Sequence, residues 1–178
     1  AAGVLAERGD DAGVLDLRRE QHRRMPRSTT YAKLKAAGSS GAWASEQSSA
    51  REVLGARDVG GLVDALLADG DIDAAWDAAT EANTESIGDH RWARLAEERE
   101  ATQPAAALSV YLRLINSTLE KADRRNYRAA ARQLKRAQKA AAAAGLSEEF
   151  DEHLAALREQ HRRRPTLIAI LDKAGLRA

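Results

Sequence analysis

The sequence contains no cysteine, and it has only one methionine, one phenylalanine and three prolines among its 178 residues. The absence of cysteine excludes disulfide bonds, thiolate zinc sites and cysteine nucleophiles within this chain. No apolar run reaches the ~20 residues that a membrane-spanning helix needs. The first residues lack the charged and apolar regions of a signal peptide, so we expect a cytoplasmic protein. The sequence does not begin with methionine, as expected of a fragment or a trimmed product.

The chain also lacks an excess of charge of one sign. It has 28 Lys and Arg residues and 27 Asp and Glu residues, which gives a net charge of +1. The chain as a whole is therefore not drawn toward nucleic acid or an acidic membrane surface. Hydrophobic residues make up 44% and charged residues 31% of the chain, which is typical of a globular protein. Abundant alanine, together with few prolines and few β-branched residues, favours helix throughout.

Apolar residues recur at helical spacing along the chain, and turn residues separate the successive runs. Pro104 is expected to lie near the start of one helix, Asp123 to cap the longest one, and Gly145 to end it. The clearest predicted helices cover residues 43–57, 90–100, 123–144, 147–164 and 166–174. We predict about ten or eleven helices and no strand. The fold class is then all-α, arranged as a tetratricopeptide-like α-solenoid of antiparallel helix pairs.

One octapeptide occurs twice in nearly identical form. Residues 19–26 read Arg-Glu-Gln-His-Arg-Arg-Met-Pro, and residues 158–165 read Arg-Glu-Gln-His-Arg-Arg-Arg-Pro. Such an internal repeat is typical of a chain built from repeated units, so we expect a single helical-repeat domain over 1–178. We also expect a sub-boundary at the Gly- and Ser-rich loop 38–41. Each copy ends on a proline, which predicts the boundary between two helices.

Patterns that carry metal or catalytic chemistry are incomplete. Residues 69–73 begin as a calcium loop does, but Ala74 and Thr80 stand where that loop needs glycine and glutamate. His153 and His161 are eight residues apart on one predicted helix, which is too far for them to share a metal ion. No Walker loop, nucleophile elbow or dinucleotide fingerprint is present. We therefore expect no cofactor, no metal site and no enzymatic activity.

The most informative charge pattern lies on the helix predicted over residues 123–144. Its basic stripe consists of Arg124, Arg128, Arg132, Lys135, Arg136 and Lys139, and a second basic cluster follows at Arg162, Arg163 and Arg164. One interpretation is the solvated outer face of an amphipathic helix, salt-bridged to a neighbour. The other is a docking face for an acidic protein or for a nucleic-acid backbone. Aromatic residues are absent from the stripe, which argues against binding of single strands by base stacking. The aromatic residues lie on apolar helix faces, and we assign them to the core. They are Trp43, Trp76, Trp92, Tyr111 and Tyr127.

Two resemblances support a helical scaffold. Trp92-x-x-Leu95-Ala96 followed by Ala107-x-x-x-Tyr111 resembles a degenerate tetratricopeptide repeat. Residues 62–76, 92–96, 104–111 and 157–176 together resemble the helical region that accompanies SWIM zinc-finger domains in bacterial proteins. The zinc ligands of that finger, a Cys-x-Cys and a Cys-x-His pair, are absent. The resemblance therefore implies a helical-repeat scaffold attached to, or derived from, proteins that bind nucleic acid or protein partners.

The expected function is a non-enzymatic interaction scaffold that binds a protein partner through the basic stripe. A nucleic-acid-associated module that contacts phosphates through the same helix face is the alternative. An enzyme or small-ligand domain with a site between helices comes third. The sequence does not indicate an oligomeric state.

Overall fold

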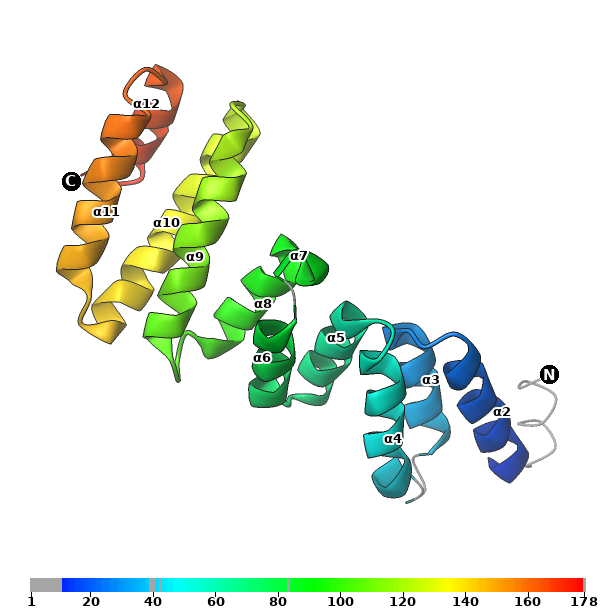
Figure 1. The fold of residues 1–178 in the computed structure, drawn as a ribbon. Coiled ribbons are helices and arrows are strands. Elements are labelled where there is room, and N and C mark those ends of the chain that lie inside the picture. The colour runs from blue at the N-terminus through cyan, green and yellow to red at the C-terminus, as the bar shows by residue number, and fades with distance from the viewer. Residues whose placement is uncertain (1–10, 39–40, 42, 83, 178) are drawn as a thin grey trace. The chain divides into compact units, whose positions relative to one another are not determined.

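The computed structural model describes residues 11–38, 41, 43–82 and 84–177. Within this part of the chain the elements are helices, labelled α2 to α12, joined by turns, and no strand occurs (Figure 1). The all-α prediction is confirmed, whereas the solenoid arrangement stays a prediction. Among the described residues, no helix is both long enough and apolar enough to cross a membrane.

Contacts between residues group the chain into two compact units, Ala1–Arg91 and Trp92–Ala178. The division falls inside helix α8 (Asp89–Arg99). It does not coincide with the predicted sub-boundary at the loop 38–41, of which residues 39 and 40 lie outside the described residues.

The first unit is built from short helices joined by short turns. They are α2 (Asp11–Arg24), α3 (Ser28–Ala37), α4 (Trp43–Gly55), α5 (Val59–Asp69), α6 (Ile72–Glu81) and α7 (Thr84–Ile87). Its core gathers Tyr31 and Leu34 of α3, Leu54 of α4 and alanines of α4 and α5, with Trp43 packed against them at the edge. Helix α3 contacts α2, α4 and α5, so these side chains hold the helices together.

Charged side chains add cross-links between helices of the first unit. The guanidinium of Arg19 on α2 donates to both carboxylate oxygens of Glu46 on α4, at 3.0 and 2.7 Å. Arg91 donates to Asp64 of α5 at 3.1 and 2.9 Å. Gly60 makes this second contact feasible, because a Cβ at that position would lie 2.8 Å from the Arg91 guanidinium.

The second unit is organised around its longest helix, α10 (Arg124–Ala144), which packs against α9 (Pro104–Glu120), α11 (Ser147–Gln160) and α12 (Pro165–Lys173) (Figure 1). The predicted ends of α10 are confirmed. The Asp123 carboxylate accepts a hydrogen bond from the Asn126 amide at 2.8 Å, and Gly145 adopts the left-handed conformation with φ of 72°. Helix α9 begins at Pro104, also as predicted.

Three sequence predictions need correction or qualification. The helix predicted over 147–164 ends at Gln160, because residues 161–164 form a turn in which Arg164 becomes the residue before α12. The helix predicted over 43–57 ends at Gly55. Of the five aromatic residues assigned to the core, Trp92, Tyr111 and Tyr127 are buried, whereas Trp43 and Trp76 are only partly buried.

Candidate functional site

The basic stripe lies on the face of α10 that points away from the core. At about 100° per residue, five of its members fall within a sector of about 80°. These five exposed stripe residues are Arg124, Arg128, Arg132, Lys135 and Lys139. The opposite face of α10 buries Tyr127, Leu134 and a row of alanines, and this packing fixes the direction in which the stripe faces.

Within the described residues, no salt bridge neutralises the five exposed stripe residues. In the described part of the chain, the one hydrogen bond between these five residues and another side chain runs from Lys135 Nζ to Gln138 Oε1, at 3.2 Å. From Arg124 to Lys139 the helix rises about 22 Å, at about 1.5 Å per residue. The result is a narrow cationic surface, of which Lys139 also interacts electrostatically with Glu100.

Arg136 is the exception in the stripe, because it turns toward α8. Its Nε donates to Glu100 at 2.8 Å, and its Nη1 pairs with Glu97. The guanidinium carbon lies 5.6 Å from the centre of the Tyr111 ring, while the Tyr111 hydroxyl donates to Glu100. Arg136 is therefore a cross-link inside the second unit, which sets it apart from the five exposed stripe residues.

The pKa values around Arg136 follow from this arrangement. Burial lowers the pKa of Arg136, but the hydrogen bond with Glu100 and the neighbouring negative charges outweigh burial and raise it. Burial raises the pKa of Glu100, yet the bonds from Tyr111 and Arg136 bring it below its usual range. Burial and the bond to Glu100 raise the pKa of Tyr111. The cluster is thus held as an ion pair with a protonated phenol, which is a structural rather than a reactive state.

The arginines of the second basic cluster differ in their contacts. Arg162 pairs with Glu159 of its own turn at 3.3 Å, and both side chains are exposed. Arg163 is exposed. Arg164 is engaged, because its Nη1 donates to the Leu119 carbonyl at the end of α9, at 2.7 Å. Exposed pairs such as that of Arg162 contribute little to stability, so Arg162 and Arg163 both remain accessible to solvent.

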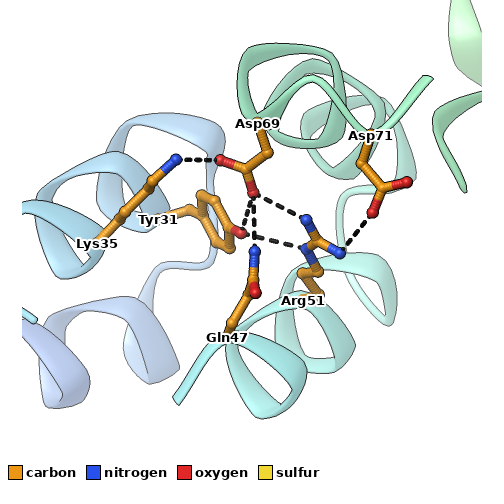
Figure 2. A network of polar contacts seen from close by, with 6 residues as sticks. All are labelled: Tyr31, Lys35, Gln47, Arg51, Asp69 and Asp71. Carbon is orange, nitrogen blue, oxygen red and sulfur yellow. Dashed lines mark hydrogen bonds and ion pairs between the residues drawn. The ribbon is translucent and has the colours of Figure 1, made fainter. Parts of the chain in front are cut away.

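A network that the sequence did not reveal joins three helices of the first unit at Asp69, the last residue of α5 (Figure 2). Its carboxylate accepts from Lys35 Nζ at 2.6 Å, from Tyr31 Oη at 2.6 Å and from Arg51 Nη2 at 2.9 Å. Gln47 adds a longer bond at 3.3 Å. The Asp69 side chain is only 6% exposed, so two cations and a phenol take the place of its water.

Arg51 extends this network to the turn between α5 and α6. Its Nη1 donates to Asp71 at 2.9 Å, and its Nε donates to the Tyr31 hydroxyl at 3.3 Å. Between the two carboxylates, Gly70 adopts a left-handed conformation with φ of 77° and ends α5. The segment 69–73, which begins like a calcium loop, is therefore a helix turn whose first two carboxylates face arginine. No cluster of metal-ligating side chains is found in the described part of the chain.

The Asp69 network gives a direct pH prediction. Burial raises the pKa of Asp69, but the hydrogen bonds from Lys35, Tyr31 and Arg51 outweigh burial and lower it from 3.8 to about 2. The folded protein then binds this proton less tightly than the unfolded chain. The stabilisation is complete above about pH 4 and is lost as the pH falls through 2. We expect Asp69 to account for about 2 kcal/mol of acid destabilisation between pH 4 and 2. Urea unfolding of the wild type and of Asp69→Asn across this range measures it, and equal pH slopes would contradict the assignment.

The two units share one local arrangement, which pairs a buried tyrosine with a carboxylate and an arginine from other helices. It consists of Tyr31, Asp69 and Arg51 in the first unit, and of Tyr111, Glu100 and Arg136 in the second. The members lie between 11 and 38 residues apart in sequence. No short motif connects them, which is why sequence reasoning missed both clusters.

The first unit also contains a hollow of about 370 Å³ between α3 and α5. Its walls include Ala32, Ala36 and Ala68, and its polar rim includes Lys35 and Asp69. Those two groups already bond each other. The hollow therefore does not present a free acid and base side by side, and no observation here favours the enzyme or small-ligand interpretation.

Comparison with known proteins gives no match for this chain, either among family models, among curated proteins or among solved structures. The resemblance to the helical region of SWIM zinc-finger proteins stays a prediction.

Proposed function

We propose that this chain is a non-enzymatic helical scaffold that binds an acidic segment of a protein partner along the five exposed stripe residues of α10. The observation that carries the proposal is that none of these five residues forms a salt bridge with another described residue. Nearby arginines of the same unit are engaged: Arg158 bonds Asp172 at 2.8 Å, Arg164 bonds a carbonyl, and Arg113 lies 4.5 Å from the Trp92 ring centre. A row of unneutralised cations on a rigid helix is suited to binding carboxylates.

An acidic peptide fits the surroundings of the stripe better than a nucleic-acid backbone does. Carboxylates border the stripe at both ends, with Asp123 at its start and the partly exposed Glu97 beside Arg136. A polyphosphate carries charge at every nucleotide and meets these carboxylates with repulsion. A peptide can place neutral residues opposite them.

The proposal is tested with a charge-reversal variant, Arg128→Glu with Arg132→Glu. Both side chains are exposed and make no salt bridge, so the fold should be retained. We expect the variant to bind a fluorescein-labelled peptide of alternating glutamate and serine at least tenfold more weakly than the wild type at 50 mM salt. Fluorescence anisotropy measures the affinity. Binding of the wild type should weaken as salt is raised, because exposed charges are screened over about 10 Å at 0.1 M ionic strength.

The matched control is Lys33→Glu with Arg57→Glu, which changes the total charge by the same amount at two exposed positions of the first unit. It should bind the peptide as the wild type does. A DNA duplex serves as the second probe. Tighter binding to DNA than to the peptide, lost only in the stripe variant, would assign the stripe to nucleic acid instead. Equal peptide binding by the stripe variant and the wild type would contradict the proposal.

A further inference from the structure

A hollow of about 390 Å³ lies where the stripe ends, between α10 and the end of α8. Its lining residues are Glu97, Glu100, Ala101, Lys139, Ala140 and Ala143. Lys139 belongs to both features, because it is the last stripe residue and also lines the hollow. The cationic surface and the hollow therefore form one continuous site in the second unit.

The hollow owes its shape to small side chains between fixed charged ones. Ala140 is buried, and the exposed Ala101 and Ala143 leave room where a larger side chain would project. On the α8 side, Glu97 and Glu100 are both bound by Arg136, which holds their carboxylates in place. The hollow thus exposes an apolar alanine surface to solvent, and the glutamates beside it are already held in position.

We infer that the acidic partner segment carries a large apolar side chain at one end, and that this side chain fills the hollow while the carboxylates that follow lie along the stripe. The inference rests on the proposed function and specifies its partner. The volume of the hollow is within the range of about 300–1,000 Å³ that small ligand sites have, which suits one or two side chains. The stripe, about 22 Å long, matches about seven residues of an extended peptide.

The charges around the hollow select an apolar group over a charged one. A cationic side chain would be repelled by Lys139, and the two glutamates that could attract it already bond Arg136. An anionic side chain would meet those same glutamates. A leucine or phenylalanine side chain meets the alanines instead and removes their apolar surface from water. Buried apolar anchors surrounded by polar contacts are the arrangement that dominates binding energy in protein interfaces.

The variant Ala143→Trp fills the hollow, and Ala142→Trp is its matched control. Both alanines are exposed neighbours on α10, but Ala142 does not line the hollow. Two labelled peptides serve as probes. Each is synthesised in two versions, with its sequence written in the forward and in the reverse order. The anchored peptide has leucine and phenylalanine at one end, followed by eight residues of alternating glutamate and serine. The plain peptide has two serines in place of the apolar pair and therefore the same charge.

We expect the wild type and Ala142→Trp to bind the anchored peptide at least tenfold more tightly than the plain one. Ala143→Trp should lose this advantage while its affinity for the plain peptide stays unchanged. Circular dichroism checks that both variants keep the helical content of the wild type. Equal binding of the two peptides to the wild type, or an unchanged advantage in Ala143→Trp, would overturn the inference.

The same measurements separate this inference from the proposed function. If the plain peptide binds and the Arg128→Glu, Arg132→Glu variant releases it, the stripe is a docking site whatever the hollow does. If the anchored peptide binds through the hollow but is insensitive to that double variant, the hollow is an apolar site and the proposed role of the stripe is wrong. If neither peptide binds at 50 mM salt, both proposals fail.

Discussion

Replacing Asp69 by asparagine should lower the free energy of unfolding by about 3 kcal/mol. Asparagine keeps the size of the side chain and can still accept from the Tyr31 hydroxyl, but it removes the charge that faces Lys35 and Arg51. Breaking one side of a buried ion pair costs about 3–5 kcal/mol, because the remaining charge stays desolvated without a partner. The lower end applies here, since the Lys35 side chain is 44% exposed and can turn back to water.

Urea denaturation of the purified variant measures this loss, and Asp71→Asn is its control. Asp71 contacts the same arginine at 2.9 Å, but its side chain is 41% exposed. An exposed ion pair contributes less than about 1 kcal/mol. The free energy of unfolding of the control should therefore differ from that of the wild type by less than this amount. If the two variants lose the same stability, burial of Asp69 does not make its network stronger than a surface pair.

The helices could be predicted because their signals are local. Asp123 and Gly145 mark the two ends of α10 through their own hydrogen bonds and dihedral angles, and Pro104 marks the start of α9 through its fixed φ. The direction of the basic stripe also followed from local periodicity, since the apolar residues of α10 define its buried face. Each of these inferences depends on residues within one or two turns of helix.

The contacts between helices could not be predicted in the same way. At about 100° per residue, Arg136 lies about 40° outside the sector of the other stripe residues. Its partners Glu97 and Glu100 are 36 to 39 residues earlier, and no local pattern identifies them. Asp69 reads as a turn residue in the sequence, and its role depends on where α3 and α4 bring Lys35 and Arg51. Long-range pairing of this kind is a property of tertiary packing, and local patterns in the sequence do not reveal it.

The duplicated octapeptide shows the same division between local and distant information. Both copies lie where one helix ends before a proline, as predicted. Their first arginines have different partners, because Arg19 reaches Glu46 on α4 whereas Arg158 reaches Asp172 on α12. Their histidines differ too: His22 is buried and bonds the Ala50 carbonyl at 2.9 Å, while His161 is only partly buried. The repeat therefore specifies a helix boundary and leaves its contacts to the neighbouring helices.

Truncation of Leu134 to alanine should lower the free energy of unfolding by about 3 kcal/mol, as much as Asp69→Asn does. Leu134 is fully buried on the inner face of α10, which packs along α9. Its neighbours on that face are alanines such as Ala130 and Ala137, which are also fully buried. Short side chains on rigid helices cannot move in to fill a new cavity, so the cavity cost adds to the lost transfer energy.

Helix propensity cannot account for such a loss, because alanine has the highest propensity of all residues. The variant Ala142→Gly on the exposed face of α10 supplies the comparison, since it changes propensity alone and should cost about 1 kcal/mol. Urea denaturation followed by circular dichroism measures both. A loss for Leu134→Ala no larger than that for Ala142→Gly would mean that α10 is held by its own helical preference. In that case the packing against α9 would not be what sets the direction of the stripe.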